Sequence, residues 1–397
     1  MSGETPFAGP TPATARLDIL DVLRGFALSG VLLVNFAESL PEATGDLDRA
    51  THWLIELGVT GSFYPLFAML FGMGFALQVA RWEARHAPAL RRYLRRVAGL
   101  FLFGLAIWCL LHTWWTLLQY AVAGLALLPF RHASPRTLLF SAAAIYALTT
   151  VAIPEIRPIV PGPDPARQRT NQQQVDDLKR EGSYPALVAA RAQTIMPFLS
   201  TPRWYLGPGL TPLWLFLLGA AIERSGILRN PTPHRSRLRR LIVWGGLMGI
   251  TTNLIVWWRS EAGVEGSGIL GSAVDAGLDL GDPALALAYG AAIVLLYTAA
   301  AAWRRRLAPL ASAGRTALSN VVLQWMVIST LLFGYGFGLL DRIGTLTCLL
   351  LSVPIFALEL WLSHRWLARH RFGPLEWLWR TMTYGRPPRS SITDLAT

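Results

Sequence analysis

The sequence contains only two cysteines, Cys109 and Cys348, and a single lysine, Lys179, among its 397 residues. Two cysteines within apolar runs support neither a disulfide framework nor a zinc site, and we expect no bound metal. Charged residues make up only 15% of the chain, whereas a soluble nucleic-acid binder carries its basic residues on an extensive polar surface. The net charge of +12 therefore predicts no nucleic-acid partner and is better explained by membrane topology.

Apolar residues are abundant where charged ones are scarce. Hydrophobic residues make up 53% of the chain, and several uninterrupted apolar runs reach about 20 residues, enough to cross a bilayer as an α-helix. A membrane β-barrel strand instead requires alternating polar and apolar residues, which these runs lack. The sequence therefore predicts an all-α fold, a polytopic transmembrane helical bundle.

The connections between the apolar runs alternate in charge. Short arginine-rich connections alternate with short acidic ones, and with about ten spans every arginine-rich connection lies on one side. The positive-inside rule places that side, and both termini, in the cytoplasm. The predicted spans are residues 17–36, 60–80, 97–113, 117–130, 137–153, 207–223, 238–258, 284–303, 316–336 and 342–363.

Three segments are polar enough to lie outside the membrane. Residues 1–15 predict a disordered cytoplasmic tail, and residues 16–370 the transmembrane bundle. Within the bundle, residues 154–205 predict an extracytoplasmic loop with one or two short amphipathic helices on the membrane surface. Residues 371–397 predict a cytoplasmic amphipathic tail, in which Trp377, Trp379 and Arg380 suit an interfacial anchor.

The first apolar run carries Asp21, Arg24 and Asn35 on one face of its predicted helix. An ionisable residue inside a membrane span is costly unless it is paired, and by default it marks a functional interior. The alternative is that Asp21 and Arg24 only neutralise each other and lock this helix against its neighbours.

Other polar residues extend this face into a predicted path across the membrane. We expect an anionic donor to bind near the inner ends of the spans, at Asp21, Arg24, Arg92, Arg95, Arg96 and Arg315. Histidine titrates near neutral pH, so His52 and His112 at the outer level are candidates for a general base. Gln119, Asn320 and Gln324 are candidates for lining the path.

Each candidate also has a simpler interpretation. His52 in a solvated loop is a surface residue, and His112 beside two tryptophans belongs to an interfacial belt. The arginines set the topology and contact lipid headgroups. Asn320 and Gln324 hydrogen-bond between helices.

The chain resembles the YeiB family of bacterial integral membrane proteins in five segments that occur in the same order. These segments are RLDILDVLRGFALSGVLLVNF at 16–36, FYPLFAMLFGMGFAL at 63–77, GSYPALVAARA at 182–192, GRTALSNVVLQ at 314–324 and FGPLEWLWRTMTYG at 372–385.

That family is similar in its first spans to the heparan-alpha-glucosaminide N-acetyltransferases and, more distantly, to the acyltransferase-3 membrane proteins. Arg24 and Asn35, eleven residues later, reproduce a pattern of the former group. His52, 13 residues before Pro65, corresponds to a luminal histidine that takes part in acetyl transfer there. In the acyltransferase-3 group the residue at the Asn35 position is itself histidine. The resemblance implies acyl-CoA as donor and a bacterial inner membrane location.

The sequence departs from the family pattern around its third and fourth spans. Typical members carry a histidine and an Asp-Gly-Asp element followed by a tyrosine. Alignment on Tyr120 puts Ile107 at the histidine position and Thr113 and Trp115 at the acidic ones. His112, one turn further along, is the candidate substitute for the missing histidine.

We therefore predict a membrane acyltransferase that moves an acyl group, acetyl by resemblance, from cytosolic acyl-CoA to an extracytoplasmic sugar, lipid or metabolite. In this prediction His52 is the general base, and Asn35 positions it or the acceptor. The alternatives are a transporter or a lipid- or small-molecule-binding protein without catalysis, and a membrane scaffold. The expected partners are the bilayer, the donor and the acceptor. Gly72 and Gly74 allow close helix packing within one bundle or between protomers, which favours a homodimer.

Overall fold

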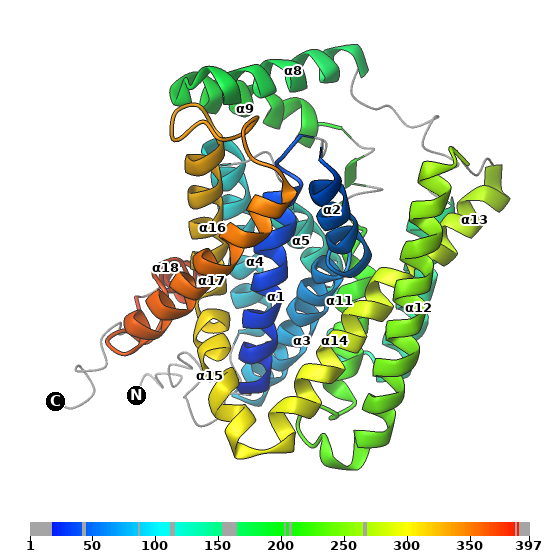
Figure 1. The fold of residues 1–397 in the computed structure, drawn as a ribbon. Coiled ribbons are helices and arrows are strands. Elements are labelled where there is room, and N and C mark those ends of the chain that lie inside the picture. Colours follow the sequence, from blue (N-terminus) through cyan, green and yellow to red (C-terminus); the bar gives the residue numbers. More distant parts are fainter. Residues whose placement is uncertain are drawn as a thin grey trace.

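A computed structural model describes residues 18–41, 45–85, 88–111, 116–152, 165–201, 204–205, 209–264, 268–385 and 387–388. These residues form helices and turns, and none of them belongs to a β-strand (Figure 1). The predicted all-α fold is confirmed. The predicted disordered tail at 1–15 lies outside the described residues.

The helices follow one another along the chain with short connections. Their bounds are α1 Asp18–Ala37, α2 Asp46–Gly58, α3 Phe63–Ala84, α4 Ala89–Leu110, α5 Thr116–Ala126, α6 Pro135–Ala147, α8 Pro165–Glu181, α9 Tyr184–Leu199, α11 Pro212–Arg224, α12 Arg235–Glu261, α13 Gly268–Asp279, α14 Gly281–Ala299, α15 Ala301–Arg315, α16 Ala317–Leu332, α17 Thr345–Leu367 and α18 Pro374–Tyr384.

Seven helical segments of the described chain are long and apolar enough to cross a membrane. They identify a multi-pass membrane protein. Each of the ten predicted spans overlaps a helix, but α5, α11 and α16 have only 11, 13 and 16 residues. At about 1.5 Å per residue, these three are shorter than the roughly 30 Å hydrocarbon core. The count of ten spans and the cytoplasmic termini therefore stay predictions.

α1 lies in the middle of the bundle and packs against α3, α15, α16 and α17 (Figure 1). It crosses α15 at two glycines. A Cβ atom added to Gly25 would lie 1.9 Å from the carbonyl oxygen of Leu310, and one added to Gly314 would lie 1.8 Å from that of Asp21. Only glycine allows the two backbones to come this close, so these residues fix the position of the polar first helix.

α3 and α11 cross in the same reciprocal way. A Cβ atom on Gly72 would lie 2.0 Å from the carbonyl oxygen of Phe216, and one on Gly219 would lie 2.0 Å from that of Met69. Gly72 thus packs within one bundle, which is one of the two possibilities predicted for it. Gly74 lies beside Arg24, whose Nη2 would be 3.2 Å from an added Cβ. The homodimer stays a prediction.

The polar segment 154–205 is largely helical in its described part. α8 and α9 lie across one end of the bundle (Figure 1). Their apolar residues form a buried cluster with the ends of α1, α16 and α17; its members include Leu32, Phe36, Val175, Leu187, Ala190, Ile328, Leu332 and Cys348. We call α8 and α9 the cap.

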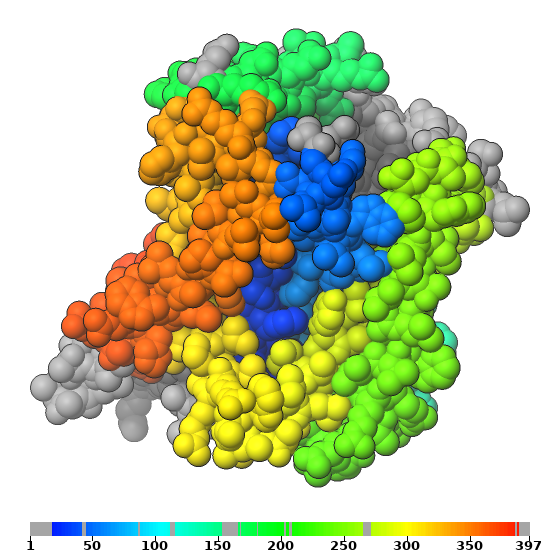
Figure 2. All heavy atoms as spheres, in the orientation of Figure 1, coloured from blue at the N-terminus to red at the C-terminus, as the bar shows by residue number. Residues whose placement is uncertain are grey.

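The C-terminal helix α18 packs against α4 and α16. Its Trp379 Nε1 donates a hydrogen bond to the carbonyl oxygen of Arg96 at 2.8 Å. The tail for which the sequence predicts an interfacial anchor is thus, in its helical part, a packed component of the bundle. At the opposite edge, α12 packs on α14 and leaves a long apolar face exposed (Figures 1 and 2), as expected of a helix that faces lipid; that face includes Val243, Trp244, Leu247, Ile250, Leu254 and Trp258.

Candidate functional site

The bundle holds two cavities that meet near its middle. The larger has a volume of about 570 Å³ and the smaller a volume of about 160 Å³. Four side chains, Phe67 of α3, Leu117 and Tyr120 of α5 and Val321 of α16, line both of them. We call these four residues the partition, because they separate the two spaces.

The smaller cavity is strongly cationic. Its lining includes the guanidinium groups of Arg24, Arg96, Arg315 and Arg380, which come from α1, α4, α15 and α18, and the single carboxylate of Glu376. We call it the arginine cavity. Guanidinium groups bind carboxylates and phosphates with two parallel hydrogen bonds, so this space suits an anion.

Contacts with the surrounding helices hold these arginines in place. Arg24 Nη1 donates to Asp21 Oδ1 at 2.9 Å, as the sequence spacing predicts. The Arg96 guanidinium lies 3.7 Å from the ring centroid of Trp379, and Arg315 Nη2 donates to the carbonyl oxygen of Arg371 at 3.3 Å. An ion pair, a cation–π contact and a backbone acceptor thus orient these three guanidinium groups.

Glu376 joins α18 to the start of α16. Its Oε1 accepts hydrogen bonds from the amide nitrogens of Leu318 at 2.6 Å and Ser319 at 3.1 Å, and its Oε2 accepts one from the Ser319 hydroxyl at 2.6 Å. These amides lie in the first turn of α16, where backbone donors have no partner within the helix. Burial raises the pKa of Glu376, and the hydrogen bonds oppose that rise.

The larger cavity carries the opposite charge. Its lining includes Glu38 after α1, Asp279 at the end of α13 and Asp282 in the first turn of α14. We call it the carboxylate cavity. Among its described lining residues there is no arginine, lysine or histidine. Burial, followed by the negative charge of Glu56, raises the pKa of Glu38. A neutral or cationic polar solute suits this space better than an anion.

Tyr120 stands where the two cavities meet. It is 2% exposed, and its hydroxyl has no hydrogen-bond partner in the described part of the chain. Its ring centroid lies 5.0 Å from that of Phe216 and 5.6 Å from that of Phe71, both edge-on. The aromatic neighbours fix the ring, so the hydroxyl is held beside both cavities and keeps its donor available.

The predicted bases are not found in either cavity lining. His52 lies on α2 with its side chain 49% exposed, and its Nε2 is 4.0 Å from Oε1 of Glu56 on the same helix. His112 lies outside the described residues, as do Thr113 and Trp115. Asn35 is buried, does not line either cavity, and its Oδ1 and Nδ2 have no hydrogen-bond partner within the described segments.

Two of the predicted path residues join helices instead of lining a cavity. Asn320 Nδ2 donates to the hydroxyl of Ser363 on α17 at 3.0 Å. Gln324 Nε2 donates to Glu359 Oε2 on α17 at 3.0 Å and to the carbonyl oxygen of Leu28 on α1 at 3.2 Å. The third, Gln119, does line the carboxylate cavity, where its Oε1 accepts from the Tyr64 hydroxyl at 3.4 Å.

Of the arginine run in α4, only Arg96 lines a cavity. Arg92 lies over the Tyr384 ring at 5.5 Å, and Arg95 is exposed close to Gly385. Both therefore lie near the C-terminal end of α18, outside the arginine cavity. Among the described residues, no three His, Cys, Asp or Glu side chains form a group that could hold a metal ion.

Sequence reasoning missed Glu38, Tyr120, Glu376 and Arg380 as site residues. Arg380 and Glu376 lie in the terminal segment FGPLEWLWRTMTYG, one of the five that resemble the YeiB family, and this resemblance was a signal. The amphipathic spacing of the segment favoured a helix on the membrane surface instead. The family pattern contains a tyrosine at Tyr120, which was a signal, but it served only to align the chain. The position of Tyr120 depends on where α5 crosses α3 and α16, which one helix pattern cannot predict.

Two family models match the chain. Residues 222–386 match the family described as "Protein of unknown function (DUF418)", and residues 16–157 match the catalytic region of heparan-alpha-glucosaminide N-acetyltransferase. A 39.9 kDa protein in the amylase 3' region of Bacillus acidopullulyticus is 30% identical over 389 residues, which cover 95% of this chain and 96% of that protein. The chain belongs to the DUF418 family.

Two further relatives match along almost the whole chain. YxaH of Bacillus subtilis is 29% identical over 401 residues, covering 94% of this chain and 96% of YxaH. YeiB of Escherichia coli is 27% identical over 383 residues, covering 92% and 95%. The acetyltransferase match spans α1 to α6, which supply Arg24, Arg96, Glu38 and Tyr120. The protein thus belongs to a membrane family with likeness to acetyltransferases, and the resemblance to YeiB is confirmed.

Proposed function

We propose that this protein transfers an acyl group from a cytosolic acyl-CoA to an acceptor that binds on the other side of the membrane. One observation carries this proposal. A cationic cavity and an acidic cavity meet at a partition of four side chains, so two substrates of different charge can approach each other there from opposite ends. The match of residues 16–157 to an acetyltransferase catalytic region supports the same chemistry.

The arginine cavity receives the donor in this proposal. Its volume of about 160 Å³ is below the roughly 300–1,000 Å³ of a pocket that encloses a small-molecule ligand. It therefore takes only part of the donor, and the guanidinium groups of its lining bind the donor's phosphates. Arg24, Arg96, Arg315 and Arg380 supply these charges, with Arg92 and Arg95 nearby at the surface.

The carboxylate cavity receives the acceptor. Its volume of about 570 Å³ fits a sugar, a lipid head or a small metabolite. Acidic side chains and the lack of basic ones among its described lining favour an acceptor that is neutral or positively charged. A polar hydroxyl or amine group of that acceptor reaches the partition.

The reaction exchanges one bond for another. The acceptor oxygen or nitrogen bonds to the acyl carbon, the carbon–sulfur bond breaks, and the proton lost by the acceptor finally reaches the CoA thiolate. Tyr120 donates a hydrogen bond to the acyl carbonyl oxygen, where negative charge develops when the acceptor attacks the acyl carbon, which is the task of an oxyanion hole. Glu38 takes the acceptor proton, because its raised pKa brings it closer to neutral pH.

His52 has an indirect role in this proposal, because its side chain is half exposed and it lies one helical turn from Glu56. It acts by way of Glu56, whose charge reaches Glu38. The arginine-rich end faces the cytoplasm of a bacterium and the cap faces outward, in keeping with the positive-inside rule.

The test measures release of CoA thiol from acetyl-CoA by purified protein, with a panel of sugars and amines as acceptors. We expect turnover by the wild type and a loss of roughly 100-fold or more in kcat for Tyr120→Phe, as for removal of one oxyanion donor. Glu38→Gln should lose turnover as well, and His52→Ala should lose less. The exposed Arg237→Gln on α12 is the control with an altered charge outside both cavities. If Tyr120→Phe releases thiol at the wild-type rate, Tyr120 does not act as the oxyanion donor and the reaction does not depend on the partition.

Transport is the second candidate, because the two cavities adjoin within the bundle and are separated only by the partition. Proteoliposomes distinguish the two. Uptake of a labelled solute with no thiol release would replace the transferase by a transporter, whereas thiol release without net uptake supports the transferase.

A further inference from the structure

Among the residues that the structure describes, the largest fully buried side chain is an arginine outside both cavities. Arg191 of α9 is 0% exposed, and its Nε, Nη1 and Nη2 atoms have no hydrogen-bond partner in the described chain. It belongs to the segment GSYPALVAARA, one of the five that resemble the YeiB family, and the proposed transfer reaction does not use it. A guanidinium with its five donors buried and unpaired is among the most costly arrangements in a protein.

The side chains around Arg191 do not offset its charge. Its guanidinium carbon lies 5.8 Å from the ring centroid of Phe333, and the titratable groups that affect it are Tyr335, Tyr184 and Cys109, with no carboxylate among them. The Tyr184 hydroxyl donates to the carbonyl oxygen of Leu110 at 3.1 Å. Burial lowers the pKa of Arg191 to about 10, which still leaves the group charged at neutral pH.

Phe333 connects Arg191 to a cleft at the surface of the cap. The cleft has a volume of about 300 Å³ and lies between α8, the end of α1 and the connection from α16 to α17; Phe333, Lys179 and Arg180 are in its lining. The ammonium group of Lys179 lies 5.9 Å from the same Phe333 ring. The Phe333 ring therefore contacts two cations of the cap, Lys179 in the lining of the cleft and the buried Arg191.

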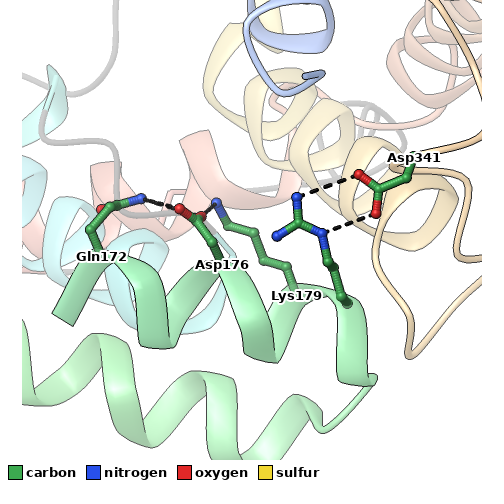
Figure 3. A network of polar contacts seen from close by, with 5 residues as sticks. Gln172, Asp176, Lys179 and Asp341 are labelled. Atoms are coloured by element: carbon green, nitrogen blue, oxygen red, sulfur yellow. Dashed lines mark hydrogen bonds and ion pairs between the residues drawn. The ribbon is translucent and has the colours of Figure 1, made fainter. Parts of the chain in front are cut away.

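Two ion pairs lie at the edge of this cleft, one within α8 and one between α8 and the connection from α16 to α17 (Figure 3). Lys179 Nζ donates to Asp176 Oδ1 at 2.7 Å, and Arg180 Nε donates to Asp341 Oδ2 at 3.0 Å. Both side chains of the Arg180–Asp341 pair are about half exposed, 49% and 52%. Exposed pairs of this kind contribute little to stability, and the Gly334 amide also donates to the carbonyl oxygen of Lys179 at 2.8 Å at this edge.

We propose that Arg191 anchors a binding site for an oxyanion, a carboxylate or phosphate group, which reaches it from the surface cleft past Phe333. The planar guanidinium offers two parallel donors to such a group, and Phe333 and the tyrosine rings accommodate an apolar body attached to it. Either a phospholipid headgroup at the membrane surface or a free small anion supplies this chemistry. Arg191 and Phe333 line neither the arginine cavity nor the carboxylate cavity, although Glu38 lines both the surface cleft and the carboxylate cavity. Binding at Arg191 is therefore measured separately from transfer.

The experiment titrates the purified full chain in detergent with inorganic phosphate and with acetate, at constant ionic strength, and follows binding by calorimetry. A parallel arm measures retention of phosphatidylglycerol against phosphatidylcholine by native mass spectrometry. We expect saturable binding by the wild type in at least one arm, and the arm that responds identifies the source of the oxyanion.

The variants assign the binding to Arg191. Arg191→Gln should weaken the affinity at least roughly tenfold, because the charge-assisted hydrogen bonds are lost. Arg191→Lys keeps the positive charge but loses the planar guanidinium, so its affinity should lie between those of the wild type and Arg191→Gln. This variant keeps the test usable if the glutamine variant does not fold. Arg237→Gln, an exposed arginine of α12, is the matched control and should bind as the wild type does.

Two results would overturn the site. One is a wild type that binds neither phosphate, acetate nor phosphatidylglycerol. The other is an Arg191→Gln or Arg191→Lys variant that binds with wild-type affinity. Neither result depends on thiol release, so the acyl-transfer proposal stands or fails separately.

Discussion

The carboxylate of Glu376 accepts hydrogen bonds from both the amide and the hydroxyl of Ser319, at 3.1 and 2.6 Å. A residue near the C-terminus thereby caps α16, a helix that begins 59 positions earlier in the chain at Ala317. The contact fixes α18 against the bundle, and with it the Arg380 side chain that lines the arginine cavity.

Replacing Glu376 by alanine should lower the free energy of unfolding by about 1–2 kcal/mol, the usual effect of losing a helix cap. Thermal unfolding in detergent, followed by tryptophan fluorescence, measures the change. Glu261→Ala at the exposed end of α12 is the control and should leave the unfolding temperature nearly unchanged. Equal behaviour of the two variants would contradict the capping role.

Gly72→Ala should destabilise the protein by about 1–3 kcal/mol, the typical cost of overpacking a tight contact. The added Cβ would lie 2.0 Å from the carbonyl oxygen of Phe216, which cannot move without shifting α11. Gly246→Ala on α12 is the matched control, because its added Cβ meets nothing within 4 Å. It should raise the stability by up to about 1 kcal/mol through helix propensity alone. Changes of the same sign in both variants would argue against the α3–α11 crossing.

Arg380→Gln should raise KM for acyl-CoA roughly tenfold and change kcat less, because it removes a charged hydrogen bond to the donor far from the reacting carbon. Steady-state thiol release with varied acetyl-CoA measures both constants. Arg369→Gln, an exposed arginine after α17, is the control and should leave KM at the wild-type value. A loss confined to kcat would place Arg380 near the reaction instead of at the donor phosphates.

Glu56→Gln should move the acid limb of the pH–rate profile to lower pH. A general base works as the carboxylate, so activity falls as the pH drops below the pKa of Glu38. Burial and the negative charge of Glu56 raise that pKa, so neutralising Glu56 lowers it and extends activity towards acid. Asp46→Asn on the same helix, with a side chain that is 93% exposed, is the control. An unmoved acid limb in Glu56→Gln would exclude Glu38 as the titrating base.

The fold class was predictable because long apolar runs with few charges have one stable structure in a bilayer. The pairing of Asp21 with Arg24 was also predictable, since residues three apart share a helix face. For the cap, the sequence predicted only a polar segment with short helices. Its position across the bundle depends on Leu187 and Ala190 packing against α1 and α16, contacts between residues more than 100 positions apart.

The site was harder to predict because its residues come from six or more helices. Arg24, Arg96 and Arg315 are recognisable as charged groups near span ends, and they line one cavity. Asn320 and Gln324 have the same polar signal, but the rotation of α16 turns them towards α17 and α1. His52 is a typical candidate base, and the direction in which α2 faces, which the sequence does not specify, leaves it half exposed.

The partition at Tyr120 has an electrical consequence. With water in both cavities, the voltage across the membrane falls mainly over the thin layer of Phe67, Leu117, Tyr120 and Val321, because water conducts ions and these side chains do not. We therefore expect the rate of the proposed transfer to depend on the membrane voltage, because a charge that moves within this layer crosses most of the field.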